Sequence, residues 1–186
     1  MHEDQQYISV DYTAKDLSDH EYINCEFNSC NFSKANLTSA TFMDCSFSEC
    51  NLAQANFKNT GLKNCTFKDC KMMGLDFNAC NDFLFAVQFS GCQLDYSTFF
   101  QKKMRKIKFT ECSLKEVDFA ETVLAEAIFD KCDLNGAVFA NTNLEKADFR
   151  TAKNYRLDPE KNTIKKAKFS VSGLPGLLEK YNIEID

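Results

Sequence analysis

The chain has 186 residues, a length that suits one domain, and 44% of them are hydrophobic, which is enough to bury a core. Its formal net charge of -5 argues against general binding to nucleic acid or to an anionic membrane, because both attract basic proteins. No apolar run approaches the roughly 20 residues of a membrane-spanning helix, and the polar, acidic N-terminus is unlike a signal peptide.

From residue 16 to residue 150 the sequence repeats every five residues. Each unit has a large apolar residue at its centre and a small residue two positions earlier, as at Phe27, Phe32 and Leu37. A period of five fits neither an α-helix nor a flat strand. Residues 1–15 precede the regular pattern, and we expect them to form an N-terminal cap, because the open edge of a sheet must be covered.

The residue type at the central positions also repeats, with a longer period of twenty residues. If four units form one square coil, residues twenty apart stack, apart from a shift of two residues near 78–83. One side stacks Phe27, Phe47, Phe67, Phe89, Phe109, Phe129 and Phe149, and the opposite side Leu37, Phe57, Phe77, Phe99, Phe119 and Phe139. The other two sides hold mainly leucine and methionine: Leu52, Met72, Leu94, Leu114 and Leu134, and Leu62, Leu84, Met104, Leu124 and Leu144. Stacked coils bury a row that no single coil can bury, so the pattern predicts an all-β solenoid.

This repeat resembles the pentapeptide-repeat family over about residues 16–150. The resemblance implies a right-handed quadrilateral parallel β-helix.

All ten cysteines fall on the small inward position. Six form one column (Cys30, Cys50, Cys70, Cys92, Cys112 and Cys132), three form a second (Cys25, Cys45 and Cys65), and Cys80 lies beside the shift. The columns could serve metal or redox chemistry, or fill the core as small hydrophobic residues. The sequence has no CxxC motif, and its only histidines are His2 and His20, so we favour core filling and predict no metal and no cofactor. Ten cysteines without a secretory signal indicate a reducing, cytoplasmic location.

Two stretches interrupt the pattern. The segment 78–83 carries two extra residues, which we expect to bulge from one edge; a tolerated insertion is the alternative. Lys102 falls on an inward position, where a charge is costly, so we expect the backbone to bulge and release it. Together with the cations that follow it up to Lys108, it predicts a basic belt.

Acidic residues gather after this belt. We select Glu111, Glu116, Asp118, Glu121, Glu126 and Asp130 as a candidate protein-binding face, with a merely solvated surface as the alternative. The sequence contains no glycine-rich phosphate loop, no GxSxG motif and no paired carboxylates at helical spacing. We therefore predict that the protein is not an enzyme and has no catalytic residues.

Residues 151–186 are expected to form a C-terminal cap, in which the repeat returns once near 162–169. Ser172 is predicted to cap a short α-helix that runs from Pro175 to about Lys180. Leu174, Leu177, Leu178, Tyr181 and Ile183 supply apolar side chains on this segment. They could cover the last coil within one chain, or join two chains in a homodimer with two-fold symmetry.

Within the family, the chain resembles the Qnr and MfpA group in its length, in the break at Asp158–Pro159 and in the terminal segment Gly173–Leu178. This resemblance implies a dimeric rod, joined through the C-terminus, that binds bacterial DNA gyrase or topoisomerase IV. It also implies protection from quinolones or toxins by an acidic rod that mimics duplex DNA. The alternative is a general cytoplasmic interaction scaffold with an unknown partner. A continuous acidic surface favours the first interpretation, and a mixed surface the second.

Overall fold

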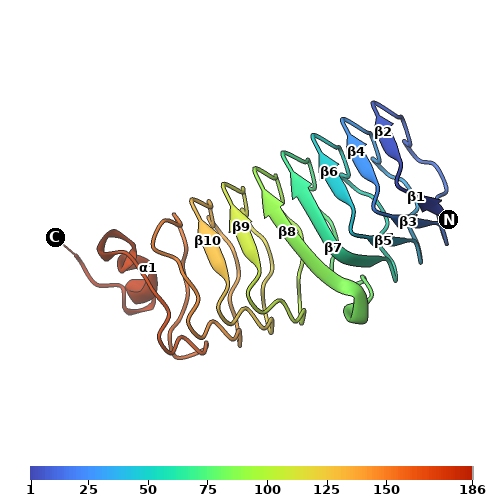
Figure 1. The fold of residues 1–186 in the computed structure, drawn as a ribbon. Helices are drawn as coiled ribbons and strands as arrows, with labels where there is room; N and C mark the ends of the chain where they lie inside the picture. The colour runs from blue at the N-terminus through green and yellow to red at the C-terminus, as the bar shows by residue number, and fades with distance from the viewer. Residues whose placement is uncertain (186) are drawn as a thin grey trace.

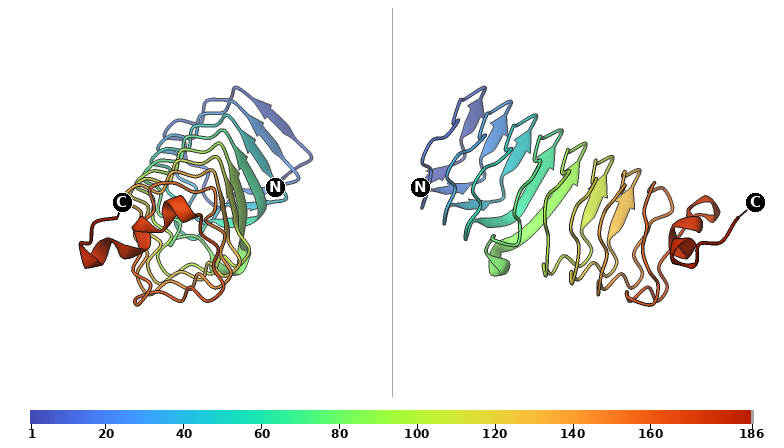
Figure 2. Two further views of the ribbon diagram at one scale, coloured as in Figure 1. Left: turned by 90° about the vertical axis from the view of Figure 1, so that its left-hand side faces the viewer. Right: turned by 180° about the vertical axis from the view of Figure 1, so that it is seen from behind.

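The computed structural model describes residues 1–185 and shows a rod of stacked four-sided coils, with the N-terminus at one end and a helical segment at the other (Figures 1 and 2). The strands are β1 (His2–Glu3), β2 (Gln6–Ile8), β3 (Glu21–Ile23), β4 (Glu26–Asn28), β5 (Thr41–Met43), β6 (Ser46–Ser48), β7 (Gly61–Lys68), β8 (Phe85–Ser90), β9 (Lys108–Thr110) and β10 (Ile128–Asp130). The helices are α1 (Pro175–Leu178) and the 3-10 turns η1 (Asp82–Leu84), η2 (Val171–Gly173) and η3 (Glu179–Tyr181). The predicted all-β, four-sided parallel β-helix with one short C-terminal α-helix is confirmed. No helix of residues 1–185 has the length and apolar character to cross a membrane.

Neighbouring coils pair in parallel, each residue facing the one twenty positions later. Tyr7 of β2 lies opposite Phe27 of β4 in this way. Between β7 and β8 the offset grows to 22, because Phe67 lies opposite Phe89, and it then returns to twenty, with Phe89 opposite Phe109. The predicted two-residue shift is therefore confirmed.

The two predicted phenylalanine columns fill opposite sides of the core. Phe109 and Phe129 stack with their ring centroids 5.4 Å apart, and in the opposite column Phe99 and Phe119 also stack at 5.4 Å. Across the core the columns meet edge to face, as Phe109 and Phe119 do at 5.9 Å. Stacking along each column and edge contacts across it are both favourable ring geometries, so the rings hold neighbouring coils in register.

Most sides of a coil end at a corner residue, two positions after the centre, that has a positive φ. Examples are Ser29 and Lys34, with φ of 52° and 58°. This conformation costs a residue other than glycine about 1–2 kcal/mol. The corner N–H donates to the next coil, as Lys34 does to the carbonyl of Ala53 at 3.1 Å, which offsets part of this cost.

The coils begin earlier than the sequence pattern predicts. β1 and β2 already pair with the following coil, and Tyr12 stacks on Phe32 at 4.8 Å. Residues 1–15, predicted as a separate cap, are therefore part of the first coil. The sequence pattern hides this coil because tyrosine, rather than phenylalanine or leucine, occupies its central positions at Tyr7 and Tyr12.

The two extra residues of the shift are accommodated in η1, at one corner of the rod. Phe85, rather than Leu84, lies opposite Leu62, so the assignment of Leu84 to this column was wrong by one residue. The regular register resumes where Val87 faces Cys65. The irregularity is thus confined to one corner and to the start of β8.

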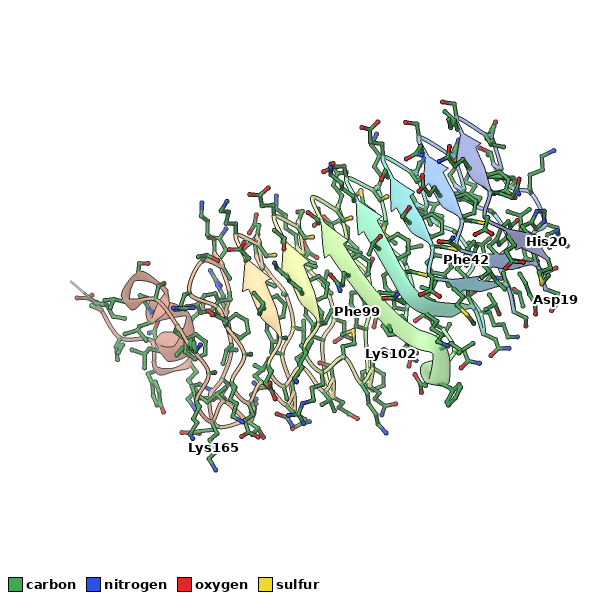
Figure 3. All side chains as sticks on the ribbon, in the orientation of Figure 1. Asp19, His20, Phe42, Phe99, Lys102 and Lys165 are labelled. Carbon is green, nitrogen blue, oxygen red and sulfur yellow. The ribbon has the colours of Figure 1, made fainter. Side chains whose placement is uncertain are left out.

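Lys102 stays in the core, so the prediction that a backbone bulge releases it is wrong. Its side chain is only 1% exposed, and it occupies an inward position like that of Thr122 one coil later. Its Nζ donates to the carbonyl of Cys80 at 2.6 Å and to the carboxylate of Asp82 at 2.5 Å. Figure 3 shows Lys102 beside the turn that carries these two acceptors. The shift itself therefore supplies the partners that make the buried charge tolerable.

The C-terminal segment continues the solenoid and then covers its end. Parallel bridges from Asn143 to Thr163 and from Asp148 to Lys168 confirm the predicted return of the repeat. The helix α1 begins at Pro175 without a side-chain cap, so the predicted cap by Ser172 is wrong; proline at the first helical position has no N–H to satisfy.

The helical segment packs closely on the last coil at Gly176. Its carbonyl accepts a hydrogen bond of 3.1 Å from the N–H of Leu157. A Cβ atom at this position would lie 2.1 Å from the carbonyl oxygen of Tyr155, so only glycine permits this close approach.

Candidate protein-binding surfaces

Four of the predicted acidic residues form a ring around the rod rather than a face. Glu111, Glu116, Glu121 and Glu126 are consecutive corner residues, each with a φ between 53° and 61°. Since each side of the coil takes five residues, a five-residue spacing carries every glutamate to the next corner. The structure therefore does not bring the four side chains together.

Neighbouring coils supply polar partners to three of these glutamates. Lys131 donates to Glu111 at 2.8 Å, Gln101 donates to Glu121 at 2.8 Å, and Arg105 pairs with Glu126. The hydrogen bond and charge of Arg105 lower the pKa of Glu126, and Glu111 likewise raises the pKa of Lys131. Cations thus offset the charge of two of the four glutamates, Glu111 and Glu126.

Asp118 and Asp130, the other two candidates, lie on different sides of the rod. Asp118 precedes Phe119 and accepts the N–H of Ala120 at 2.8 Å. Asp130 follows Phe129 in β10 and accepts the hydroxyl of Thr151 at 2.9 Å. Both carboxylates are half-buried. The first stabilises the backbone beside it, and the second links its coil to the next one.

A different set of carboxylates does share one side of the rod, which we call the acidic side. It is the side whose centres include Phe77, Phe99 and Phe119. Its outward and corner positions before residue 150 carry Asp16, Asp19, Asp76, Asp118 and Glu121, with Lys58 as the one cation. The sequence analysis missed three of these residues because it compared neighbours five apart; comparison at twenty-residue spacing would have found them.

The predicted basic belt spreads over two sides. Lys103, Arg105 and Lys106 belong to the side that has Met104 at its centre, and Lys108 belongs to the next. Arg105 and Lys106 both lie near Glu126, with Lys106 at 3.9 Å. Within residues 1–185, Lys103 has no ion-pair partner.

The cysteine columns lie inside the core. All ten thiols are free and buried, and nine of them, all but Cys80, donate to backbone carbonyls of residues 1–185, as Cys50 does to Phe27 at 3.3 Å. Burial raises the pKa of Cys45 to about 11, and the thiol of Cys132, followed by burial, raises the pKa of Cys112 to about 12. Among residues 1–185 no three His, Cys, Asp or Glu side chains converge in a way that could hold a metal ion.

The predicted dimer residues surround the helical segment at the end of the rod. Leu174, Tyr181 and Ile183 are 43%, 55% and 55% exposed, whereas Leu177 and Leu178 are half-buried. A cleft of about 470 Å³ runs between the segment and the last coil, lined by Leu178 and Ile183 among others. The segment covers the coil incompletely and leaves apolar side chains at its outer surface.

One exposed aromatic residue escaped the sequence analysis. Phe83 lies in η1, and its side chain is 94% exposed. The five-residue repeat is interrupted at Phe83, so the repeat could not show whether this side chain points into the core or outward.

Two family models match the chain. One, described as the pentapeptide repeat region, matches residues 40–119. The other, described as pentapeptide repeats (8 copies), matches residues 22–48, 103–139 and 118–153. Together they span residues 22–153, which is most of the solenoid. No curated protein sequence matches the chain.

Solved structures share the fold at low sequence identity. HetL, a pentapeptide repeat protein involved in heterocyst differentiation regulation in Nostoc sp. strain PCC 7120, is 15% identical with a TM-score of 0.66, over 92% of this chain and 88% of that one. A trypsin-treated variant of QnrB1, a plasmid-mediated fluoroquinolone resistance protein, is 20% identical with a TM-score of 0.50, over 100% of this chain and 99% of that one. At such identities the likeness concerns the fold.

Proposed function

Because this chain belongs to the pentapeptide-repeat family, we propose that it is a non-enzymatic rod that binds another protein through its long sides. The observation that carries this proposal is that the rigid coils hold a varied set of exposed side chains at fixed positions along the rod. Core stacking and corner hydrogen bonds set the outward positions, and the side chains on them mix both charges with exposed apolar residues such as Tyr96 and Val138. A preordered surface of this kind loses little conformational freedom on binding.

Affinity purification from the native cells tests this role. The bait is the wild-type rod, and the control bait is an unrelated β-helix of similar size. We expect a protein that the wild type enriches and that the control retains less well. If the wild type enriches nothing beyond an unrelated β-helix of similar size, the proposal fails.

A second candidate function is binding to DNA gyrase or topoisomerase IV with protection against fluoroquinolones. The acidic side favours it, since its carboxylates outnumber its exposed lysines, Lys15 and Lys58. The similarity to QnrB1, a fluoroquinolone resistance protein, also supports it. Charge density opposes close mimicry of DNA. From Asp16 to Asp118 the acidic side rises five coil steps, or about 24 Å at the usual strand spacing. Duplex DNA carries about 14 phosphates over that length.

A gyrase supercoiling assay with ciprofloxacin, titrated with the purified protein, tests this candidate. Rescue of supercoiling supports it, and rescue should weaken when Asp76 and Asp118 become asparagine. The double variant Glu111→Gln with Glu116→Gln is the matched control, since these two corner residues do not belong to the acidic side. No rescue at any concentration rejects the topoisomerase as the partner and leaves the broader proposal intact.

We further propose that two rods join at their C-terminal ends. The exposed Leu174, Tyr181 and Ile183 provide the apolar surface for such a contact. A contact with two-fold symmetry would leave the long sides of both rods free for partners.

A further inference from the structure

Phe83 is an exception among the phenylalanines of the chain. It is 94% exposed, whereas every other phenylalanine of residues 1–185 is buried or half-buried. It lies in the two-residue insertion, where no core position requires an aromatic side chain. Phenylalanine, like tyrosine and tryptophan, is enriched in the buried cores of protein interfaces, so Phe83 could contribute apolar area to a contact with a partner.

The turn that presents Phe83 is fixed from three directions. The side chain of Asn81 accepts the N–H of Phe83 at 3.0 Å, and the N–H of Phe85 donates back to the carbonyl of Asp82. From inside the coil, Lys102 donates to Asp82 and to Cys80. These bonds hold η1 in place, so Phe83 is presented on an ordered turn.

A shallow hollow begins two residues after Phe83. Its volume is about 190 Å³, and its lining mixes the apolar side chains of Phe85, Val87 and Met104 with the polar residues Asn64 and Gln88. Lys103 and Arg105 also line it, together with Lys106. The surface that follows η1 thus combines a partly apolar hollow with a cluster of cations.

We propose that η1 and this hollow form a docking site for an acidic segment of a partner protein that carries a large apolar side chain. The inference rests on the proposed protein-binding function and assigns it a site and a partner chemistry. Carboxylates of the segment pair with Lys103 and its neighbouring cations, while the apolar side chain packs in the hollow and against Phe83. A polyphosphate chain fits less well, because it has no apolar group to pack against Phe83 and the apolar side chains of the hollow.

Selection of random 12-residue peptides displayed on phage, against the immobilised wild-type protein, tests the proposal. We expect enriched peptides in which a leucine or an aromatic residue is flanked by aspartate or glutamate. A synthetic fluorescent peptide with the enriched sequence should bind Phe83→Ala and Lys103→Glu at least tenfold more weakly than the wild type.

Tyr96→Ala and Lys58→Glu are the matched controls, since they remove an exposed aromatic residue and reverse an exposed lysine elsewhere on the rod. Both should bind the peptide as the wild type does, and thermal unfolding should show that all four variants remain folded.

The proposal is overturned if no peptide is enriched. It is also overturned if the enriched peptides bind Phe83→Ala unchanged, although binding at another site would leave the broader protein-binding function standing. Binding of a fluorescent oligothymidine that depends on Phe83 and Lys103 more strongly than peptide binding does would assign the site to nucleic acid instead.

Discussion

The length of the Lys102 side chain explains how a charge is accommodated at an inward position. The methylene groups occupy core space at a position where the next two coils place Thr122 and Thr142. The ammonium group reaches the edge of the coil, where η1 folds over it and supplies a carbonyl and a carboxylate. The Asp82 side chain is 85% exposed, so water also stabilises that end of the pair.

We expect Asp82→Ala to lower the free energy of unfolding by about 1 kcal/mol, because Lys102 loses its charged acceptor and keeps the carbonyl of Cys80. In a Lys102→Met background the same change should cost less than about 0.5 kcal/mol, since no buried charge remains. Urea unfolding of the four proteins measures both values. Asp76→Ala, on the same coil, is the control and should cost the same in both backgrounds. Equal costs for Asp82→Ala in the two backgrounds would contradict the coupling.

At the scale of an element, the cysteine columns act as packing material. Burial raises the pKa of Cys45 to about 11, and the pKa values of Cys92 and Cys112 are raised to about 12 by hydrogen bonding along the column and by burial. These thiols are therefore protonated at neutral pH, and the protonated form is a poor nucleophile.

Labelling with a thiol reagent such as Ellman's reagent at pH 8 should accordingly be slow in the native protein. In guanidinium chloride all ten thiols should react at once. The time course of absorbance gives both rates. A native thiol that reacts as fast as a free cysteine would contradict the packing role and revive the redox interpretation.

The C-terminal helical segment is held to the last coil partly by charge. Lys180 lies 2.7 Å from both Asp158 and Glu160, and these contacts lower the pKa of each carboxyl group. A depressed pKa in the folded state stabilises the folded form above the unfolded pKa of about 4, and this contribution is lost as the pH falls through the folded value.

Hydrogen exchange over residues 174–181 should therefore become faster below pH 4, after correction for the intrinsic pH dependence of exchange. In Lys180→Met the same amides should already exchange faster at pH 7 and should change little on acidification. Amides of β4, in the core of the solenoid, serve as the internal reference. If acidification leaves protection unchanged in the wild type, charge does not hold the segment.

The core columns could be predicted from the sequence, but the arrangement of the surface side chains could not. The phenylalanine columns could be predicted because Phe109 and Phe129 are of one kind and twenty residues apart. The fate of Lys102 could not, because it depends on an acceptor, Asp82, whose position follows from the local geometry of the shift. The glutamates from Glu111 to Glu126 looked continuous in sequence, yet the coil carries each to a different corner.

At the scale of the whole molecule, charge is distributed unevenly along the rod. The first 50 residues contain nine acidic residues (Glu3, Asp4, Asp11, Asp16, Asp19, Glu21, Glu26, Asp44 and Glu49) and two lysines (Lys15 and Lys34). Cations become frequent from Lys102 onward. A partner that follows the rod is therefore oriented by this gradient, and in a dimer joined at the C-terminus the acidic ends would be the two outer tips.

The C-terminal dimer leads to the last prediction. The wild-type protein should elute with twice the 21.2 kDa of one chain in size-exclusion chromatography with light scattering. Leu174→Glu with Ile183→Glu should give monomers, because a charge on each exposed apolar side chain must be desolvated in the contact. Ile8→Glu, which changes a 66% exposed isoleucine at the opposite end, is the matched control and should leave the dimer intact. A wild-type monomer at all concentrations, or a dimer that survives the double change, would place any self-association elsewhere on the rod.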